Sequence, residues 1–170
     1  MNPTNQKILF VLVLATLLAG SVLFWQNRQL VVGEDRQSFE YQKLGTEDEW
    51  RAKLSPEAYG ILREGGTEKP FSSPLNNENR PGTYVAADTG EPAFRSEDKF
   101  DSGTGWPSFT KPIKPDAIVT RVDNTLFTER TEVLTTAGGH LGHVFTDGPA
   151  PTGLRYCMNG AALRFVPDIK

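Results

Sequence analysis

The feature that most restricts the fold of this chain is an alternation, beginning near residue 83, of short β-branched and aromatic runs with Gly, Pro and Asp. Short apolar runs bounded by turn-forming residues are typical of strands in a β domain. With 16 glycines and 12 prolines, the chain is well supplied with turns. We therefore expect a mainly β domain. The expected strands are Thr83–Ala86, Ala117–Val122, Thr125–Thr135, His140–Phe145 and Leu154–Phe165.

A short helical segment is expected before the strands. Thr46 and Glu49 have the spacing of a capping box at a helix start. Ser55-Pro56 is typical of the cap and first position of a second helix, which would continue to about Arg63. Gly65-Gly66 would end that helix. The sequence thus predicts two short helices ahead of the β domain.

The segment Ile8–Trp25 is apolar and carries no charge. At about 1.5 Å per residue, a helix of this length approaches the roughly 30 Å hydrocarbon core of a bilayer. We expect residues 1–27 to be a membrane anchor or signal segment, residues 28–45 a linker and residues 46–170 the functional domain. A single anchor is favoured, with the domain on the far, periplasmic side of the membrane.

The alternative for this segment is a secretory signal peptide. Ala19–Ser21 is a weak candidate for a small-residue cleavage site, although apolar residues continue beyond it. Cleavage there would release the protein from the membrane, and the protein would then be secreted.

Composition excludes two classes of function. The chain has 18 Lys and Arg against 21 Asp and Glu, a net charge of −3 at pH 7, so it lacks the basic surface typical of nucleic-acid binding. The single cysteine, Cys157, can form neither an intrachain disulfide nor a zinc site that needs two or more thiolates. Any thiol chemistry therefore takes its second sulfur from another molecule.

The side chains best suited to catalysis fall within residues 140–159. On a regular strand, Arg155, Cys157 and Asn159 would share one face, where the guanidinium favours the nucleophilic thiolate. Asp147 could fix the tautomer of a nearby imidazole. The whole set is His140, His143, Asp147, Arg155, Cys157 and Asn159.

Simpler interpretations of these residues stay open. Cys157 could be a small buried hydrophobic residue, and Arg155 with Asn159 could be a solvated strand face. The two histidines and Asp147 could hold a metal ion. A spacing of three on a regular strand, however, puts the imidazoles on opposite faces of the sheet.

Four segments together resemble the type B methionine sulfoxide reductases, and the resemblance extends over about residues 46–167. It implies two antiparallel β-sheets packed around a core with short peripheral N-terminal helices, and an oxidoreductase that reduces methionine R-sulfoxide. The segments are EGGTEKPFSSPL (64–75), DSGTGWPSF (101–109), RTEV (130–133) and HLGHVFTDGPAPTGLRYCMNGAALRF (140–165).

The resemblance also implies roles for individual residues. Cys157 would be the nucleophile. His140 and His143 would line the site and supply a proton to the sulfoxide oxygen. Trp106 would form the apolar wall that receives the S-methyl group, and Phe145 would contribute to substrate binding.

The polar residues around the nucleophile also receive roles from the resemblance. Asp147 and Arg155 would sit behind the histidines and tune the imidazole and the thiolate. Asn159 would hold the polar end of the substrate.

The chain departs from many members of that family at the positions of a structural zinc. Two CxxC pairs hold the metal in those members. Here the first pair aligns with Ala86 and Thr89, and the second falls in residues 135–138, where this chain is one residue shorter. We therefore expect no zinc and no other cofactor.

A second departure concerns the reductant. Many members carry a resolving cysteine where this chain has Thr104. The resemblance and the cysteine count together imply that an external thiol, such as that of a thioredoxin-like protein, reduces a sulfenic acid on Cys157. We expect a monomer that repairs exported proteins. The alternative is a binding module that keeps the sulfoxide pocket without turnover.

Overall fold

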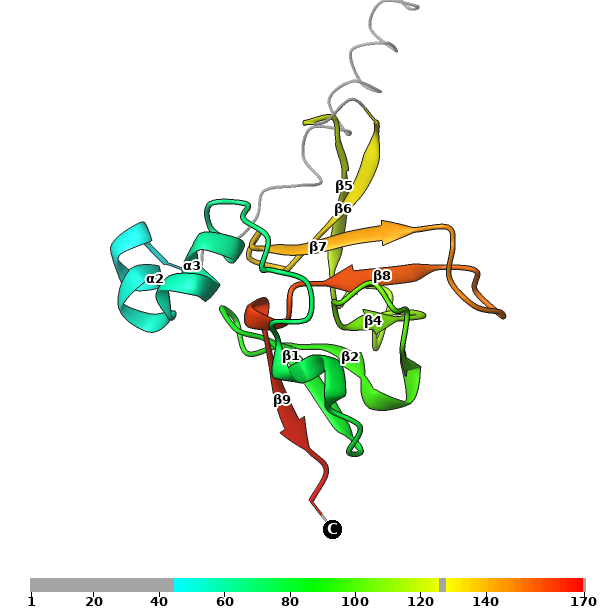
Figure 1. Ribbon diagram of the computed structural model, residues 1–170. Helices are drawn as coiled ribbons and strands as arrows, with labels where there is room; N and C mark the ends of the chain where they lie inside the picture. Colours follow the sequence, from blue (N-terminus) through cyan, green and yellow to red (C-terminus); the bar gives the residue numbers. More distant parts are fainter. Residues whose placement is uncertain (1–44, 126–127, 170) are drawn as a thin grey trace, which may run out of the picture. The chain divides into compact units, whose positions relative to one another are not determined.

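The computed structural model describes residues 45–125 and 128–169, and its strands form two antiparallel sheets (Figure 1). This confirms the mainly β architecture expected from the sequence. The smaller sheet has the order β2 (Pro92–Arg95), β1 (Gly82–Ala86) and β9 (Leu163–Pro167). The larger sheet has the order β3 (Lys99–Phe100), β4 (Ser108–Phe109), β8 (Arg155–Met158), β7 (His140–Phe145), β6 (Arg130–Leu134) and β5 (Val119–Asp123).

Aromatic rings join the two sheets in a common core. Phe109 of the larger sheet stacks on Phe94 of the smaller one, with ring centroids 4.5 Å apart, and meets Tyr84 edge-on at 4.9 Å. All three side chains have no exposed surface. Aromatic pairs at these separations stabilise a core beyond the area that they bury. The contact fixes the position of the larger sheet against the smaller one.

The two expected helices are present as α2 (Glu47–Lys53) and α3 (Pro56–Leu62). Thr46 and Glu49 form the expected capping box at the start of α2, and the Ser55 hydroxyl accepts the Ala58 N–H at the start of α3. Figure 1 shows both helices at one side of the sheets. Ile61 and Leu62 of α3 pack into the common core.

The prediction of one strand over Leu154–Phe165 was wrong. The chain leaves the larger sheet after β8, turns through the 3₁₀ helix η3 (Gly160–Ala162), and enters the smaller sheet as β9. The turn needs a glycine, since a Cβ on Gly160 would lie 1.9 Å from the Ser73 hydroxyl oxygen. Asn159 therefore caps η3 and does not continue the strand.

Other strand predictions differ from the structure mainly in their ends. β7 has the predicted bounds, and β1 gains one residue. β6 is shorter than Thr125–Thr135, because the Thr125 N–H and hydroxyl both bond the Asp123 carboxylate at the β5–β6 turn. β2, β3 and β4 were not predicted. Two of them have only two residues, too short for a periodic signal.

No helix in residues 45–125 or 128–169 is long and apolar enough to cross a bilayer. The apolar segment Ile8–Trp25, on which the prediction of an anchor depends, lies outside the described residues.

Candidate functional site

One face of the larger sheet carries the polar residues, while the other face packs into the core. Strand pairing sets four side chains in one row across β6, β7, β8 and β4: Glu132, His143, Cys157 and Ser108. The residue that follows Glu132, Cys157 or Ser108 is completely buried in the core, because strand side chains alternate between faces. The core thus fixes which side chains are presented beside the thiol.

A bulge in β7 adds His140 to this face. Val133 pairs with Gly142 and Leu134 with His140, so β7 has one more residue than β6 at this point. Such an insertion reverses the alternation of side chains beyond it. The two imidazole centroids lie 5.4 Å apart. The prediction that the histidines point to opposite faces was therefore wrong.

The bulge in β7 and the alternation of strand side chains bring together the residues of a small pocket, of about 160 Å³, around the thiol. Six of the residues that line it were singled out from the sequence: Trp106, His140, His143, Phe145, Cys157 and Asn159. Thr67 and Arg130 also line it and were not predicted as site residues. The volume holds little more than one side chain. The pocket therefore combines one thiol, two imidazoles and one indole wall.

Each imidazole has a carboxylate partner, and neither partner is Asp147. His140 Nδ1 lies 2.7 Å from Glu132 Oε1, and His143 Nε2 lies 2.8 Å from Asp123 Oδ2. Such contacts orient an imidazole and select its tautomer. The prediction that Asp147 has this function was wrong. The partners come from the neighbouring strands β6 and β5.

The two imidazole–carboxylate pairs differ in the pKa shift that their surroundings cause. Burial lowers the pKa of His140 below its ordinary value, and the hydrogen bond to Glu132 opposes that shift. The pKa of Asp123 is well below its usual range, first because Thr125 bonds the carboxylate and then because His143 and Arg130 do. Asp123 is therefore a firmly ionised anchor for His143.

Asp147 instead orients Arg155. The guanidinium Nε and Nη2 donate to the two carboxylate oxygens over 2.9 and 2.8 Å. The pKa of Arg155 is raised above its ordinary value, first by this hydrogen bond, while burial opposes that shift. The Arg155 guanidinium also stacks 4.5 Å above the Phe145 ring. The ion pair therefore fixes a guanidinium cation on the same face of β8 (Arg155–Met158) as Cys157.

A buried loop residue, Glu68, positions the other side of the pocket. Its main-chain N–H donates to Asn159 Oδ1 over 3.1 Å, and its carbonyl accepts the Trp106 indole N–H over 3.3 Å. Its carboxylate accepts the N–H groups of Gly160 and Ala161 over 2.7 and 2.8 Å. Burial raises the pKa of Glu68. The loop is thereby held against the turn that carries Asn159.

A chain of hydroxyl groups reaches the sulfur from the side of β4. Thr104 Oγ1 lies 3.9 Å from Cys157 Sγ and 2.8 Å from Ser102 Oγ. Ser102 Oγ lies 2.8 Å from the completely buried Ser108 Oγ. Hydrogen bonds therefore join the three hydroxyl groups, and the Thr104 hydroxyl is the one that lies next to the sulfur.

The turns where zinc ligands would be expected are joined by hydrogen bonds. Asp88, which has no exposed surface, accepts the Thr135 hydroxyl over 2.7 Å and the Thr89 N–H over 2.7 Å. The Thr135 hydroxyl oxygen in turn accepts the Gly139 N–H. Across the described ranges, no three His, Cys, Asp or Glu side chains cluster as metal ligands do. A carboxylate, a hydroxyl and main-chain groups therefore join the two turns.

Sequence reasoning missed Asp123, Glu132, Arg130 and Glu68. Glu132 and Arg130 lie in the RTEV segment, and Glu68 lies in EGGTEKPFSSPL. Both segments contributed to the family resemblance, but no site role was predicted for these three residues. Alternation along a strand places Glu132 on the face opposite the buried Val133, which is the face that carries the thiol. No local pattern marks Asp123, because its contact depends on how β5 pairs with β6.

Comparison with known proteins gives consistent similarities. Residues 54–167 match the family described as SelR domain. The peptide methionine sulfoxide reductase MsrB of Agrobacterium fabrum is 52% identical over 120 residues, which is 70% of this chain and 89% of that protein. The MsrB of Leptospira interrogans is 48% identical over 126 residues, which is 74% of this chain and 96% of that protein.

A longer relative also matches. The peptide methionine sulfoxide reductase MsrA/MsrB of Vibrio cholerae is 54% identical over 123 residues, and the matched region is 72% of this chain. The chain spans only 32% of that protein. The similarity to this relative is therefore confined to one part of it.

Proposed function

The chain belongs to the SelR-domain family of peptide methionine sulfoxide reductases, and on that premise we propose that it reduces methionine R-sulfoxide to methionine at Cys157. The observation that carries the proposal is the pocket itself. It sets the only cysteine of the chain among two imidazoles, an indole and an amide. This is the set of groups that a sulfoxide needs, because its methyl is apolar and its oxygen is basic.

Selection of the R epimer follows from the separation of apolar and polar walls. The Trp106 ring receives the S-methyl group, while the imidazoles surround the oxygen. Asn159 has one amide N–H left after its contact with the Leu141 carbonyl, and this N–H is free to bind the substrate. The S epimer would exchange the positions of methyl and oxygen and leave buried donors unpaired, which is costly.

In the chemical step the Cys157 thiolate attacks the sulfoxide sulfur. This attack forms a bond between the two sulfurs while the sulfoxide oxygen takes up a proton. The S–O bond of the substrate and the new S–S bond then break as the oxygen passes to the Cys157 sulfur. The methionine sulfur gains two electrons, and the cysteine sulfur loses two and becomes a sulfenic acid. The Arg155 cation supports the thiolate before attack.

The proton comes from an imidazole in this mechanism. His140 Nδ1 is engaged by Glu132 and His143 Nε2 by Asp123, so Nε2 of His140 and Nδ1 of His143 are the nitrogens left for the substrate. A protonated imidazole donates to the leaving oxygen as it gains negative charge. This single proton balances the step, because the thiolate, the sulfoxide and one proton together contain the atoms of methionine and the sulfenic acid.

An external thiol completes the cycle. It attacks the sulfenic acid, water leaves, and a mixed disulfide forms on Cys157. A second thiol then releases the reduced enzyme and a disulfide. A dithiol of a thioredoxin-like protein supplies both equivalents. Thr104, at 3.9 Å from the sulfur, cannot act as a resolving group because it has no thiol.

We further propose that the protein is a membrane-anchored monomer without zinc that acts on exported proteins. The uncharged segment Ile8–Trp25 supports an anchor, and the periplasm is the corresponding location for a bacterial protein. The hydrogen-bonded Asp88 between the two turns supports the absence of zinc. Elemental analysis of tag-free protein after chelation tests this point, and stoichiometric retained zinc would contradict it.

The central test gives the full chain each epimer of a peptide-bound methionine sulfoxide, with dithiothreitol as reductant. We expect turnover of the R epimer alone, and none with Cys157→Ser. Dimedone should label one sulfenic acid per chain after substrate treatment without reductant. Folded protein that binds the R epimer and shows no turnover would refute the enzyme and support a binding module.

A further inference from the structure

A second hollow adjoins the catalytic pocket, and Trp106 lines both. Its volume is about 350 Å³, roughly twice that of the catalytic pocket at about 160 Å³. We call it the Trp106 cleft. Its lining is mostly polar and includes Asn76, Glu78, Ser96 and Lys99, with Phe71 as an aromatic edge. The proposed reaction does not use any of these four polar groups.

The ring of Phe71 is presented to solvent by a strained backbone. Its side chain is 71% exposed, and its φ of 64° lies in the left-handed region that non-glycine residues rarely adopt. The Phe71 N–H donates to the Gly105 carbonyl over 2.7 Å, and a Cβ on Gly105 would lie only 2.9 Å from the Phe71 ring. The segment next to Trp106 therefore holds an exposed aromatic ring in one place.

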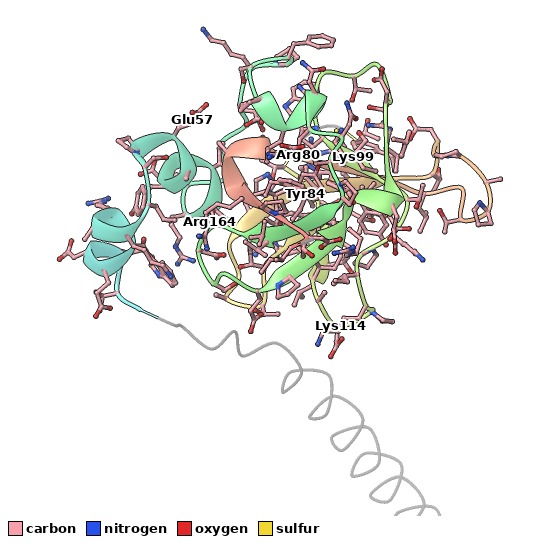
Figure 2. The ribbon with its side chains drawn as sticks, turned by 90° about the horizontal axis from the view of Figure 1, so that it is seen from below. Glu57, Arg80, Tyr84, Lys99, Lys114 and Arg164 are labelled. Carbon is pink, nitrogen blue, oxygen red and sulfur yellow. The ribbon has the colours of Figure 1, made fainter. Side chains whose placement is uncertain are left out.

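The polar wall of the Trp106 cleft is also held in place. Asn76 Nδ2 donates to the Gly105 carbonyl over 2.8 Å, and Lys99 Nζ donates to the Asn76 carbonyl over 2.8 Å. Burial lowers the pKa of Lys99, while Asp101 and Glu78 oppose that shift. The hydroxyl of Tyr84, which is labelled in Figure 2 together with Lys99, donates to the Glu78 carbonyl over 3.1 Å. The cleft is therefore built before any ligand arrives.

We infer that the Trp106 cleft binds the polypeptide chain that flanks the methionine sulfoxide. This inference rests on the proposed function. The catalytic pocket has room for one side chain, so the rest of a peptide substrate must lie outside it. Trp106 lines both hollows, so the Trp106 cleft lies directly beside the catalytic pocket. Ammonium, amide and hydroxyl groups suit main-chain carbonyl and N–H groups, and the Phe71 ring suits an apolar side chain next to the methionine.

The test compares two substrates with one reductant, dithiothreitol. One is N-acetyl methionine R-sulfoxide methylamide, and the other is a short peptide with leucine on both sides of the methionine R-sulfoxide. For Phe71→Gly we expect the ratio of peptide KM to small-substrate KM to rise about tenfold, equivalent to about 1.4 kcal/mol of lost peptide binding. Glycine accepts the φ of 64° without strain, so this variant keeps its fold.

Two further variants control the measurement. Phe71→Tyr keeps the ring and should keep the wild-type ratio. Val166→Ala removes an apolar side chain that is 48% exposed on β9 of the smaller sheet, and should also keep that ratio. Both controls distinguish loss of the aromatic contact from a general effect of surface substitution.

Each remaining outcome contradicts the inference. A KM ratio that stays within twofold of wild type in Phe71→Gly would show that the cleft does not bind the peptide. A defect that appears only when a thioredoxin-like protein replaces dithiothreitol would assign Phe71 to reductant docking. Absence of turnover with both substrates in the unsubstituted protein would refute the proposed function itself.

Discussion

Replacing Glu68 by alanine should lower both the stability of the fold and the affinity for sulfoxide. Glu68 is only 6% exposed, and its carboxylate accepts hydrogen bonds from two main-chain N–H groups, those of Gly160 and Ala161. Hydrogen bonds to a charged group contribute about 1.5–3 kcal/mol each. Burial of the carboxylate, which raises the pKa of Glu68, offsets part of that gain.

The net loss expected for Glu68→Ala is about 2–3 kcal/mol in the free energy of unfolding, because the N–H groups lose their acceptor. For a domain of this size, that corresponds to a melting temperature lower by about 10 °C. Glu68→Gln keeps one acceptor oxygen and should lose about half as much. The KM for a small R-sulfoxide substrate should rise in both variants, since the Glu68 main chain holds Trp106 and Asn159.

The assay is urea unfolding of the full chain, followed by circular dichroism, together with steady-state kinetics. Glu64→Ala is the matched control, because Glu64 is an exposed carboxylate four residues earlier in the same segment. A Glu68→Ala variant within about 0.5 kcal/mol of the control would refute the assigned hydrogen-bond contribution. Lower stability with an unchanged KM would refute the positioning of Trp106 and Asn159.

Three other substitutions address the polar face around the thiol. Glu132→Gln removes the charge that supports protonation of His140, whose pKa is already lowered by burial. The alkaline limb of the single-turnover pH profile should therefore move to lower pH. An unmoved limb would exclude His140 as the acid. The pKa of Asp147 is lowered by Arg155, so this ion pair contributes stability above about pH 4, the ordinary aspartate pKa, and loses it as pH falls further. Asp147→Asn should therefore lower the urea midpoint near neutrality and have little effect in acid, and an equal effect at all pH values would contradict this. Thr104→Val removes the hydroxyl 3.9 Å from the sulfur and should slow alkylation of the thiol by iodoacetamide severalfold, whereas an unchanged rate would show that the contact is incidental.

Much of the local structure could be predicted from short segments. The capping box of Thr46 and Glu49 and the Ser55 cap depend on spacings of three residues, which local sequence contains in full. The bounds of β7 follow from an apolar and aromatic run between glycine and aspartate. The count of one cysteine is enough to limit the chemistry to one internal sulfur.

Local patterns failed where long-range pairing decides geometry. The run Leu154–Phe165 has the pattern of one strand, yet close packing of Gly160 against Ser73 turns the chain from one sheet to the other. The spacing of His140 and His143 places them on opposite faces unless β7 contains a bulge. That bulge exists only in its pairing with β6.

The sequence by itself determined the inventory of the site: one thiol, two imidazoles and a nearby guanidinium within residues 140–157. Only the tertiary structure decided how they are connected. Asp123 and Glu132 reach the imidazoles from β5 and β6, and Asp147 is left to Arg155. The physical reason is that alternation along a strand is a local property. The partner opposite each side chain depends on strand register, which the packing of the whole core determines.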